Sequence, residues 1–507
     1  MRKFCALLLL LAMIFTLTAC DFLPIFTPAS DEDCKEHIWS EYKHNEYAHW
    51  REYICGCPWP ELVEEHINID GDLNCDVCGR ELYVQTWDAE DLLASAAEKM
   101  SVSSAHFNDG GYCEFLEKIA DFSAKFSEKA YERYGEGKNI SVSPISVYMA
   151  LALVCECADG ETREEVLNAV GVTYEEVNKY TKYLYALCNQ EFYAWDDETN
   201  EKVVSGYELL TNSIWLDDEV PFKNTGVQKL ANDYNCDVFQ TDFDSDKAKQ
   251  SLKAYIEEKT RGLIDGTLPV DADTVFVLLN TFYLKEAWTN FGEDLPFSSK
   301  TFTFTNYDGT TVDQKLLISD YTVGKAQSFD TYSVYYAETS NGLRLYFVVP
   351  CGDNTVSDVF TQENIKNVLS INDWQGHEIN ETDDNMMLVC HKTRVFFPEF
   401  EAEFAESIND ILKEDFSILS LFNTETCNMS NVTDGNVYCS GVVHKSKLKV
   451  DKTGIEGAAI TAAIMAGEAA DPFTYEYHDF VVDRSFGFIL TDRYGTVLFS
   501  GAVNNIE

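Results

Sequence analysis

The N-terminal part of the chain gathers side chains that could bind a metal ion. Residues 34–80 hold five of the 16 cysteines and four of the 9 histidines of the 507-residue sequence. Two pairs of candidate ligands, Cys34 with His37 and Cys75 with Cys78, have two residues between their members, a spacing that lets both reach one tetrahedral zinc ion. The candidate ligands are Cys34, His37, Cys55, Cys57, His66, Cys75 and Cys78.

So short a segment can bury little apolar surface, so it needs a covalent or metal cross-link to fold. Zinc would supply one and would couple metal binding to folding. Disulfides are the second interpretation, because cysteines outside the cell commonly pair. A segment without any cross-link is the third.

The signatures of the common enzyme classes are missing from the sequence. It contains no Gly-x-Ser-x-Gly, no His-Glu-x-x-His and no glycine-rich phosphate loop. Carboxylates are so numerous that no pair stands out as a general acid and base. We therefore expect no catalytic residues and no enzyme.

The net charge limits the partners. Lys plus Arg number 38 against 86 Asp plus Glu, a net charge of -48. Such a surface repels the phosphate backbone of nucleic acids. We expect no nucleic-acid binding.

The first residues are typical of a secretory signal. Basic Arg2 and Lys3 precede an apolar run, residues 4–15, that is too short to span a bilayer comfortably. Leu17 to Cys20 then looks like a bacterial lipobox, in which the Cys20 thiol receives a lipid. We expect a signal peptide over 1–19, a tether over 20–33, and an extracytoplasmic protein anchored by lipid to the outer face of the membrane.

Hydrophobic periodicity separates the rest into a polar, partly helical connector over 81–112 and one large mixed domain over 113–507. The spacing predicts helices over 115–134 and 147–155. A continuous apolar run over 274–284 predicts a buried central strand. Further strands are expected over 343–350, 393–398, 437–443, 479–490 and 496–503. The fold class is α+β.

Six motifs in this domain, in order, resemble those of the serpins. They are Asn139 to Ser146, Ala158 to Thr162, Asn280 to Lys285 with Trp288, His444-Lys445 with the run to Gly454, Asp483 to Phe486, and Leu498 to Gly501. The resemblance implies the serpin fold: a large central sheet, two further sheets, about eight to nine helices and an exposed reactive loop. It also implies a monomeric inhibitor of serine proteases, with cysteine proteases as a second target class, that needs no cofactor to inhibit.

The resemblance assigns roles to buried polar residues. Ser143, Ser146, Asn280 and His444 would form the shutter beneath the central sheet, where a polar network can change partners as strands separate. Trp288 would lie at the top of the sheet, where the loop enters.

The segment after Val450 fits a loop that becomes a strand. The hinge would comprise Gly454, Ile455, Glu456, Gly457, Ala458 and Ala459. With period two, one face of the strand carries Ile455, Gly457, Ala459, Thr461, Ala463 and Met465, none of them charged. No proline occurs between Val450 and Asp471, as a central strand requires.

The family's usual hinge length puts the scissile bond between Glu468 and Ala469, which predicts a protease that prefers acidic residues. The loop looks longer than usual, however. Cleavage after Met465, Ala466 or Ala469 would instead suit an elastase-like or subtilisin-like protease.

Two other functions stay open. Lys452, Ile455 and Ile460 stand where the family usually has Glu, Thr or Ser, and Ala, which favours a non-inhibitory serpin that binds a partner without inserting its loop. Alternatively, the Cys/His segment is the functional part of a metal-binding surface lipoprotein.

A metal titration of residues 34–80 distinguishes the interpretations of that segment. Zinc ligation predicts binding of zinc at a fixed ratio, with folding of the segment on binding and loss of structure on chelation. Disulfides predict that only a reductant has this effect. Indifference to both would contradict any cross-link.

Overall fold

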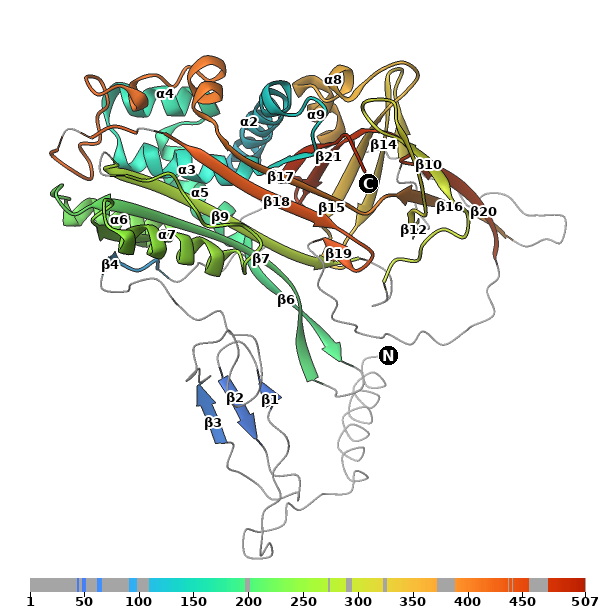
Figure 1. Cartoon of the computed structure of the whole chain (residues 1–507), viewed down its shortest axis with the longest axis horizontal. Coiled ribbons are helices and arrows are strands. Elements are labelled where there is room, and N and C mark those ends of the chain that lie inside the picture. The colour runs from blue at the N-terminus through green and yellow to red at the C-terminus, as the bar shows by residue number, and fades with distance from the viewer. Residues whose placement is uncertain are drawn as a thin grey trace, which may run out of the picture. The chain divides into compact units, whose positions relative to one another are not determined.

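The computed structural model describes residues 43–44, 48–51, 62–65, 91–97, 109–196, 201–271, 274–288, 294–321, 326–371, 388–435, 437–439, 441–455 and 473–506 (Figure 1). The chain divides into two compact units, 1–84 and 85–507. Cys20, all seven candidate zinc ligands and the loop from Glu456 to Ala469 lie outside the described residues. Within the described ranges, no helix combines the length and the apolar character that crossing a bilayer requires.

In the first unit, three short strands form an antiparallel sheet. They are β1 (Lys43–His44), β2 (Ala48–Arg51) and β3 (Leu62–Glu65). β2 lies in the middle, with Lys43 opposite Trp50 on one side and Ala48 opposite Glu65 on the other.

The second unit is built around an eight-stranded mixed sheet, which we call the main sheet. Its order is β17-β18-β19-β9-β7-β8-β4, and β6 pairs with β7. The strands are β4 (Leu92–Ala94), β6 (Asn189–Asp196), β7 (Glu201–Asp217), β8 (Cys236–Thr241), β9 (Phe276–Ala287), β17 (Phe400–Ser407), β18 (Val443–Val450) and β19 (Gly454–Ile455).

In the described part of the second unit, three smaller sheets accompany the main sheet. A six-stranded sheet has the order β13-β14-β15-β21-β22-β5, and a three-stranded sheet has the order β12-β16-β20, next to the hairpin β10-β11. Their bounds are β5 (Ile140–Val142), β10 (Phe302–Thr305), β11 (Thr311–Gln314), β12 (Leu317–Tyr321), β13 (Ala326–Ser328), β14 (Tyr332–Glu338), β15 (Arg344–Pro350), β16 (Leu388–Phe397), β20 (Phe473–Val481), β21 (Phe486–Thr491) and β22 (Val497–Val503).

The helices begin at residues that suit helix starts. Pro144 opens α3 at a position where its missing N–H costs nothing, and Thr173 and Glu176 form a capping box on α5. The helices are α2 (Gly110–Tyr134), α3 (Pro144–Cys157), α4 (Gly160–Val170), α5 (Tyr174–Leu187), α6 (Asn224–Tyr234), α7 (Asp246–Lys259), α8 (Val356–Val359) and α9 (Gln362–Leu369).

Apolar side chains cover both faces of the main sheet. The larger core includes Phe282 and Leu284 of β9 and packs against α2 and α3. The smaller core lies under α7, where Trp215 stacks on Phe239 at 4.0 Å between ring centroids and both meet Tyr255 edge-on. β9 is thus buried on both faces, as its continuous apolar run predicts.

Three segments differ from the sequence-based expectation. Residues 91–97, within the expected partly helical connector, contain strand β4 on the edge of the main sheet. Residues 437–439 form no strand, because Val437 and Cys439 are buried in the core from a loop, and β18 begins only at Val443. Residues 479–490 break at 482–485 and so contribute to β20 and β21, which belong to different sheets.

Asn235 offers a test of how β4 is held. It ends α6 in the left-handed conformation (φ 48°), and its Nδ2 donates to the Ala97 carbonyl at 2.6 Å. Asn235→Ala loses this hydrogen bond and adds backbone strain, so we expect the free energy of unfolding to fall by about 2 kcal/mol. Asn235→Gly loses only the hydrogen bond and should cost about 1 kcal/mol. Urea unfolding of both variants measures this, and equal losses would contradict the strain component.

Candidate functional site

The two-residue strand β19 lies between β18 and β9 at one end of the main sheet. Ile455 is opposite Val450 of β18 and Glu286 of β9, and Gly454 is opposite Ala287. Both pairings are antiparallel, so β18 and β9 run parallel to each other. We call the line between these two strands the seam. Ile455 is fully buried, which places the first expected hinge residues inside the sheet.

The hairpin that leads into β19 is fixed at the mouth of the seam. The indole N–H of buried Trp288 donates to the Asp451 carbonyl at 2.7 Å. Lys452 forms an ion pair with Asp294 at 2.6 Å, and its backbone N–H donates to Glu399 at 3.0 Å. The lysine that departs from the family pattern therefore has an acidic partner.

A second lysine connects the two sides of the seam. Lys445 of β18 donates from Nζ to the carbonyls of Asp265 and Thr267, at 2.8 and 2.6 Å. These carbonyls lie in the segment between α7 and β9. Two charge-assisted hydrogen bonds thus join β18 to the segment that leads into β9, across the seam that a new strand would have to widen.

Three of the expected shutter residues lie together at the start of α3. The backbone N–H of Ser143 donates to Nε2 of His444 at 3.0 Å. The Ser143 hydroxyl donates to the Leu498 carbonyl at 2.8 Å and lies 3.0 Å from the Ser146 hydroxyl. Because Nε2 accepts, His444 is neutral, and complete burial lowers its pKa to about 4.

Asn280, the fourth, has a separate set of partners, on the side of β9 that faces away from the seam. Its Nδ2 donates to Oδ1 of Asn212 on β7 at 2.7 Å, and Asn212 donates to the Tyr234 carbonyl at 2.9 Å. The Asn280 Oδ1 atom is buried and has no hydrogen-bond partner among the described residues. A buried acceptor in this state is costly and leaves room for a new donor.

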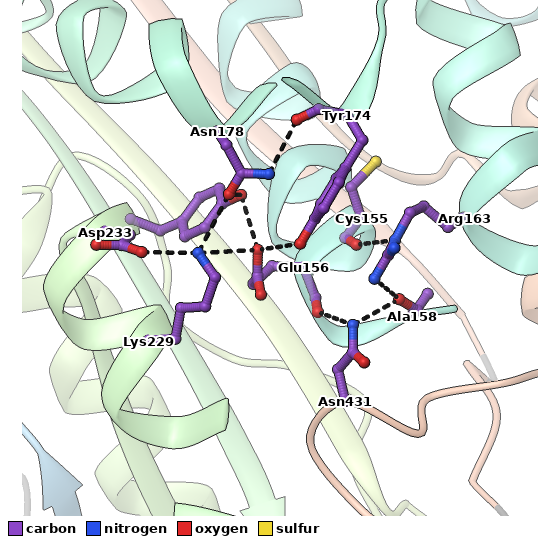
Figure 2. Close-up of polar contacts among 10 residues, drawn as sticks. Cys155, Glu156, Ala158, Arg163, Tyr174, Asn178, Lys229, Asp233 and Asn431 are labelled. Atoms are coloured by element: carbon purple, nitrogen blue, oxygen red, sulfur yellow. Dashed lines mark hydrogen bonds and ion pairs between the residues drawn. The ribbon is translucent and has the colours of Figure 1, made fainter. Parts of the chain in front are cut away.

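The far end of α3 is held by a buried carboxylate (Figure 2). Glu156 accepts from the hydroxyls of Tyr174 and Tyr234 at 3.0 and 3.1 Å, and Lys229 of α6 lies 3.4 Å away. Figure 2 also shows that Arg163 and Asn431 donate hydrogen bonds to backbone carbonyls at this end of the helix. The acceptors are the carbonyls of Cys155, Glu156 and Ala158. Tyr234 thereby links Glu156 to Asn212 and Asn280, so α3 is fixed at both ends.

The sequence did not reveal several of these contacts. Asp294, Asn212 and the carbonyls bound by Lys445 come from distant parts of the chain, and no local spacing marks them. Within the described ranges, no group of three or more Cys, His, Asp or Glu side chains is placed to hold a metal ion.

Known proteins share this architecture. The sequence model described as Serpin (serine protease inhibitor) matches residues 117–506. An uncharacterized serpin-like protein of Methanosarcina acetivorans is 26% identical over 382 residues, covering 73% of this chain and 83% of that protein.

Solved structures agree on the fold. The thermophilic serpin tengpin in its native state matches with a TM-score of 0.62 at 20% identity, over 82% of this chain and 97% of that one. Thyroxine-binding globulin in complex with thyroxine matches with a TM-score of 0.59 at 21% identity, over 76% and 99%. At this identity the likeness establishes the α+β serpin fold.

The neutral His444 predicts a loss of stability in acid. An exposed histidine in the unfolded chain binds a proton near pH 6.5, whereas His444 in the folded chain does so only near pH 4. Between these values the unfolded state binds more protons, so the free energy of unfolding should fall with falling pH, by about 3 kcal/mol in total.

Urea unfolding at pH 7 and pH 4.5, on the natural chain and on His444→Gln, isolates this contribution. Gln can accept from Ser143 but does not titrate. Buried carboxyls with a raised pKa make the folded state more stable as the pH falls, and they do so in both proteins. The contribution of His444 is therefore the difference between the pH dependence of the natural chain and that of the variant. The same pH dependence in both would contradict a neutral buried His444.

Proposed function

This chain belongs to the serpin family, and we propose that it inhibits serine proteases by the family's insertion mechanism. A protease cleaves the loop between β19 and β20, and the freed segment enters the seam as a new strand of the main sheet. The protease, attached as an acyl-enzyme through its own serine, is carried along and trapped. The chain itself contributes no catalytic residue.

The observation that supports this most is the register at β19. If the antiparallel pairing of Ile455 with Val450 and Glu286 is continued, each following residue has one partner on β18 and one on β9. Gly457 would then lie between Leu448 and Leu284, and small residues on the inserted strand would meet large ones. Such alternation fills a core without overpacking it.

The same register pairs polar groups with polar groups. Thr461 would lie between His444 and Asn280, within reach of the buried Asn280 oxygen that has no partner among the described residues. On the other face, Glu456 would lie between Lys449 and Lys285. Opposite charges on neighbouring strands stabilise a sheet.

The departures from the family pattern are compatible with insertion in this register. Ile455 is already accommodated in the sheet, with Val450 beside it. Ile460 would point to the same face as Lys445, opposite the face that carries His444. About a dozen new strand residues, each with a net hydrogen bond of roughly 1 kcal/mol, would release on the order of 10 kcal/mol. That is comparable to the stability of a whole domain.

The partner classes follow from the loop and the N-terminus. We propose a serine protease, with cysteine proteases as a second class, cleaving at Glu468-Ala469 or after Met465, Ala466 or Ala469. We propose that Cys20 carries the lipid that holds the protein outside the cell, and that residues 34–80 bind zinc.

A binding role is the second candidate, supported by a cavity away from the seam. The cavity has a volume of about 600 Å³ and lies between α2, α9 and the turn that joins β21 and β22. Apolar Leu116, Ile119 and Leu369 line it together with Lys366 and Tyr494. A mixture of apolar wall and a few polar groups suits a small organic ligand. Thyroxine-binding globulin, of the same fold, binds thyroxine.

The test is to mix the mature chain with an elastase-like protease and with a Glu-preferring protease and to look for a covalent complex on denaturing gels. We expect a stable band, and the mass of the released C-terminal fragment gives the cleaved bond. Clean cleavage without a complex, for every serine and cysteine protease tried, would contradict inhibition and favour the binding role.

Matched loop variants test the direction of insertion. Ala459→Glu puts a charge on the face that would meet Phe282 and Ser446 inside the core, so trapping should fall at least about tenfold. Ala458→Glu puts the same charge on the outer face beside Lys447 and Tyr283, under the Arg261 guanidinium, and should change trapping by less than about threefold. Equal effects would contradict the proposed register.

A further inference from the structure

Three carboxyl side chains are buried together at the mouth of the seam. Glu208 lies on β7, Glu286 on β9, and Asp492 in the turn between β21 and β22. Their exposed fractions are 3%, 1% and 6%. We call these three residues the carboxyl cluster.

Glu286 is held by a turn of the six-stranded sheet. Asn341, in the turn between β14 and β15, donates from Nδ2 to both carboxyl oxygens of Glu286, at 3.1 and 2.8 Å. The opposite strand provides space through Gly206, where a Cβ atom would lie 2.7 Å from Oε1 of Glu286. Glu286 is also the residue of β9 that Ile455 pairs with, so its carboxyl lies where insertion begins.

Asp492 lies in a turn of the same six-stranded sheet, between β21 and β22. Its Oδ1 accepts from the backbone N–H groups of Tyr494 and Thr496, both at 2.8 Å. Arg493 is the cation that acts on all three carboxyls. The other groups that face the cluster are the thiol of Cys188, the Tyr112 hydroxyl, Asn341 and Thr339.

Burial favours the protonated form of all three carboxyls. It raises the pKa of Glu286 to about 8 and the pKa of Asp492 above its usual value. For Glu208, burial and then the nearby Asp492 and Glu286 raise the pKa well above the usual value. Burial also raises the pKa of Cys188 and of Tyr112, so these two stay neutral.

The cluster joins two parts that insertion would separate. β17 packs on β5 and β22, and β18 packs on β5, whereas β9 meets the six-stranded sheet through Phe282, which stacks on Phe499, and through its end at Trp288. We take β9 and β7 to be the strands that move when the seam widens. Glu208 and Glu286 would move with those strands, whereas Asp492 and Asn341 would stay with the six-stranded sheet. Opening of the seam therefore moves Glu208 and Glu286 away from Asp492 and exposes the carboxyl cluster to water.

We propose that the carboxyl cluster is a proton-operated latch on the main sheet, which holds β7 and β9 closed when protonated and releases them when its protons are lost. This deepens the proposed function, because it regulates the insertion step, and it rests on that function. Its chemical signal is the proton.

The direction follows from linkage. A glutamate that water reaches titrates near pH 4.5, whereas Glu286 in the closed sheet titrates near pH 8. Between these values opening releases a proton, so each such group raises the opening equilibrium by up to about tenfold per pH unit as the pH rises. His444 acts in the opposite sense only below about pH 6.5, so pH 7 to 8.5 isolates the cluster.

A synthetic peptide with the sequence of residues 455–467 tests the latch without a protease. Its rate of incorporation into the full mature chain is followed by native gel shift at pH 7.0 and 8.5. We expect a rise of about five- to tenfold for the natural chain. Glu286→Gln removes the group that titrates near pH 8, so its rise between the two pH values should be at least about threefold smaller than that of the natural chain.

Glu403→Gln is the matched control, because the Glu403 side chain on β17 is 71% exposed. It should keep the full pH response. The same response in Glu286→Gln as in the natural chain overturns the latch. If Glu286→Gln does not fold, hydrogen exchange of the natural chain makes the test without a variant.

Hydrogen exchange of the β9 amides needs no variant and no peptide. After correction for intrinsic exchange, protection at residues 282–287 should be at least about threefold lower at pH 8.5 than at pH 7.0. If protection at these residues is the same at both pH values, the latch is overturned. This holds even if the peptide fails to enter the sheet at either pH. A pH-dependent β9 in a chain that traps no protease would support the latch while the inhibitory function fails, so the two proposals are separable.

Discussion

The structure depends on one geometric constraint: two parallel strands of a mixed sheet with an antiparallel strand started between them. β18 and β9 both pair with β19 in the antiparallel sense, so a chain that continues in the β19 direction can bond to both edges at once. Trp288 and Lys452 fix where that chain enters, and Lys445 ties β18 to the segment that precedes β9. Together these contacts define where the seam begins and which strands form its two edges.

Much of this could be predicted from the sequence, because the signals are local. The apolar run of β9 and the Ser-Pro start of α3 follow from side-chain pattern and backbone chemistry, and the family motifs place His444 and Trp288. The helix and strand limits shift by a few residues where a loop residue such as Cys439 is buried without being in a strand. Hydrophobicity alone cannot distinguish those two cases.

The contacts that the sequence did not predict join residues that are far apart in the chain. Asp294 is one of 86 acidic residues, and nothing near it indicates that it meets Lys452. Glu286 stands in a strand as an ordinary polar residue, and only the fold reveals that Gly206 and Asn341 lie against it and that Glu208 is its neighbour. Burial decides the protonation of such a group, and burial is a property of the assembled sheets.

The strand β4 changes how the origin of this chain is understood. Residues 91–97 hydrogen-bond to Asp237 of β8 and to Ala231 of α6, and so lie within the large unit while leading back to the Cys/His segment. A fusion between two ancestral genes would have had to join upstream of this strand, or the new linker had to acquire sheet-forming residues afterwards. Recombination that exchanges the N-terminal segment among relatives would keep these hydrogen bonds only if the crossover spares residues 91–97.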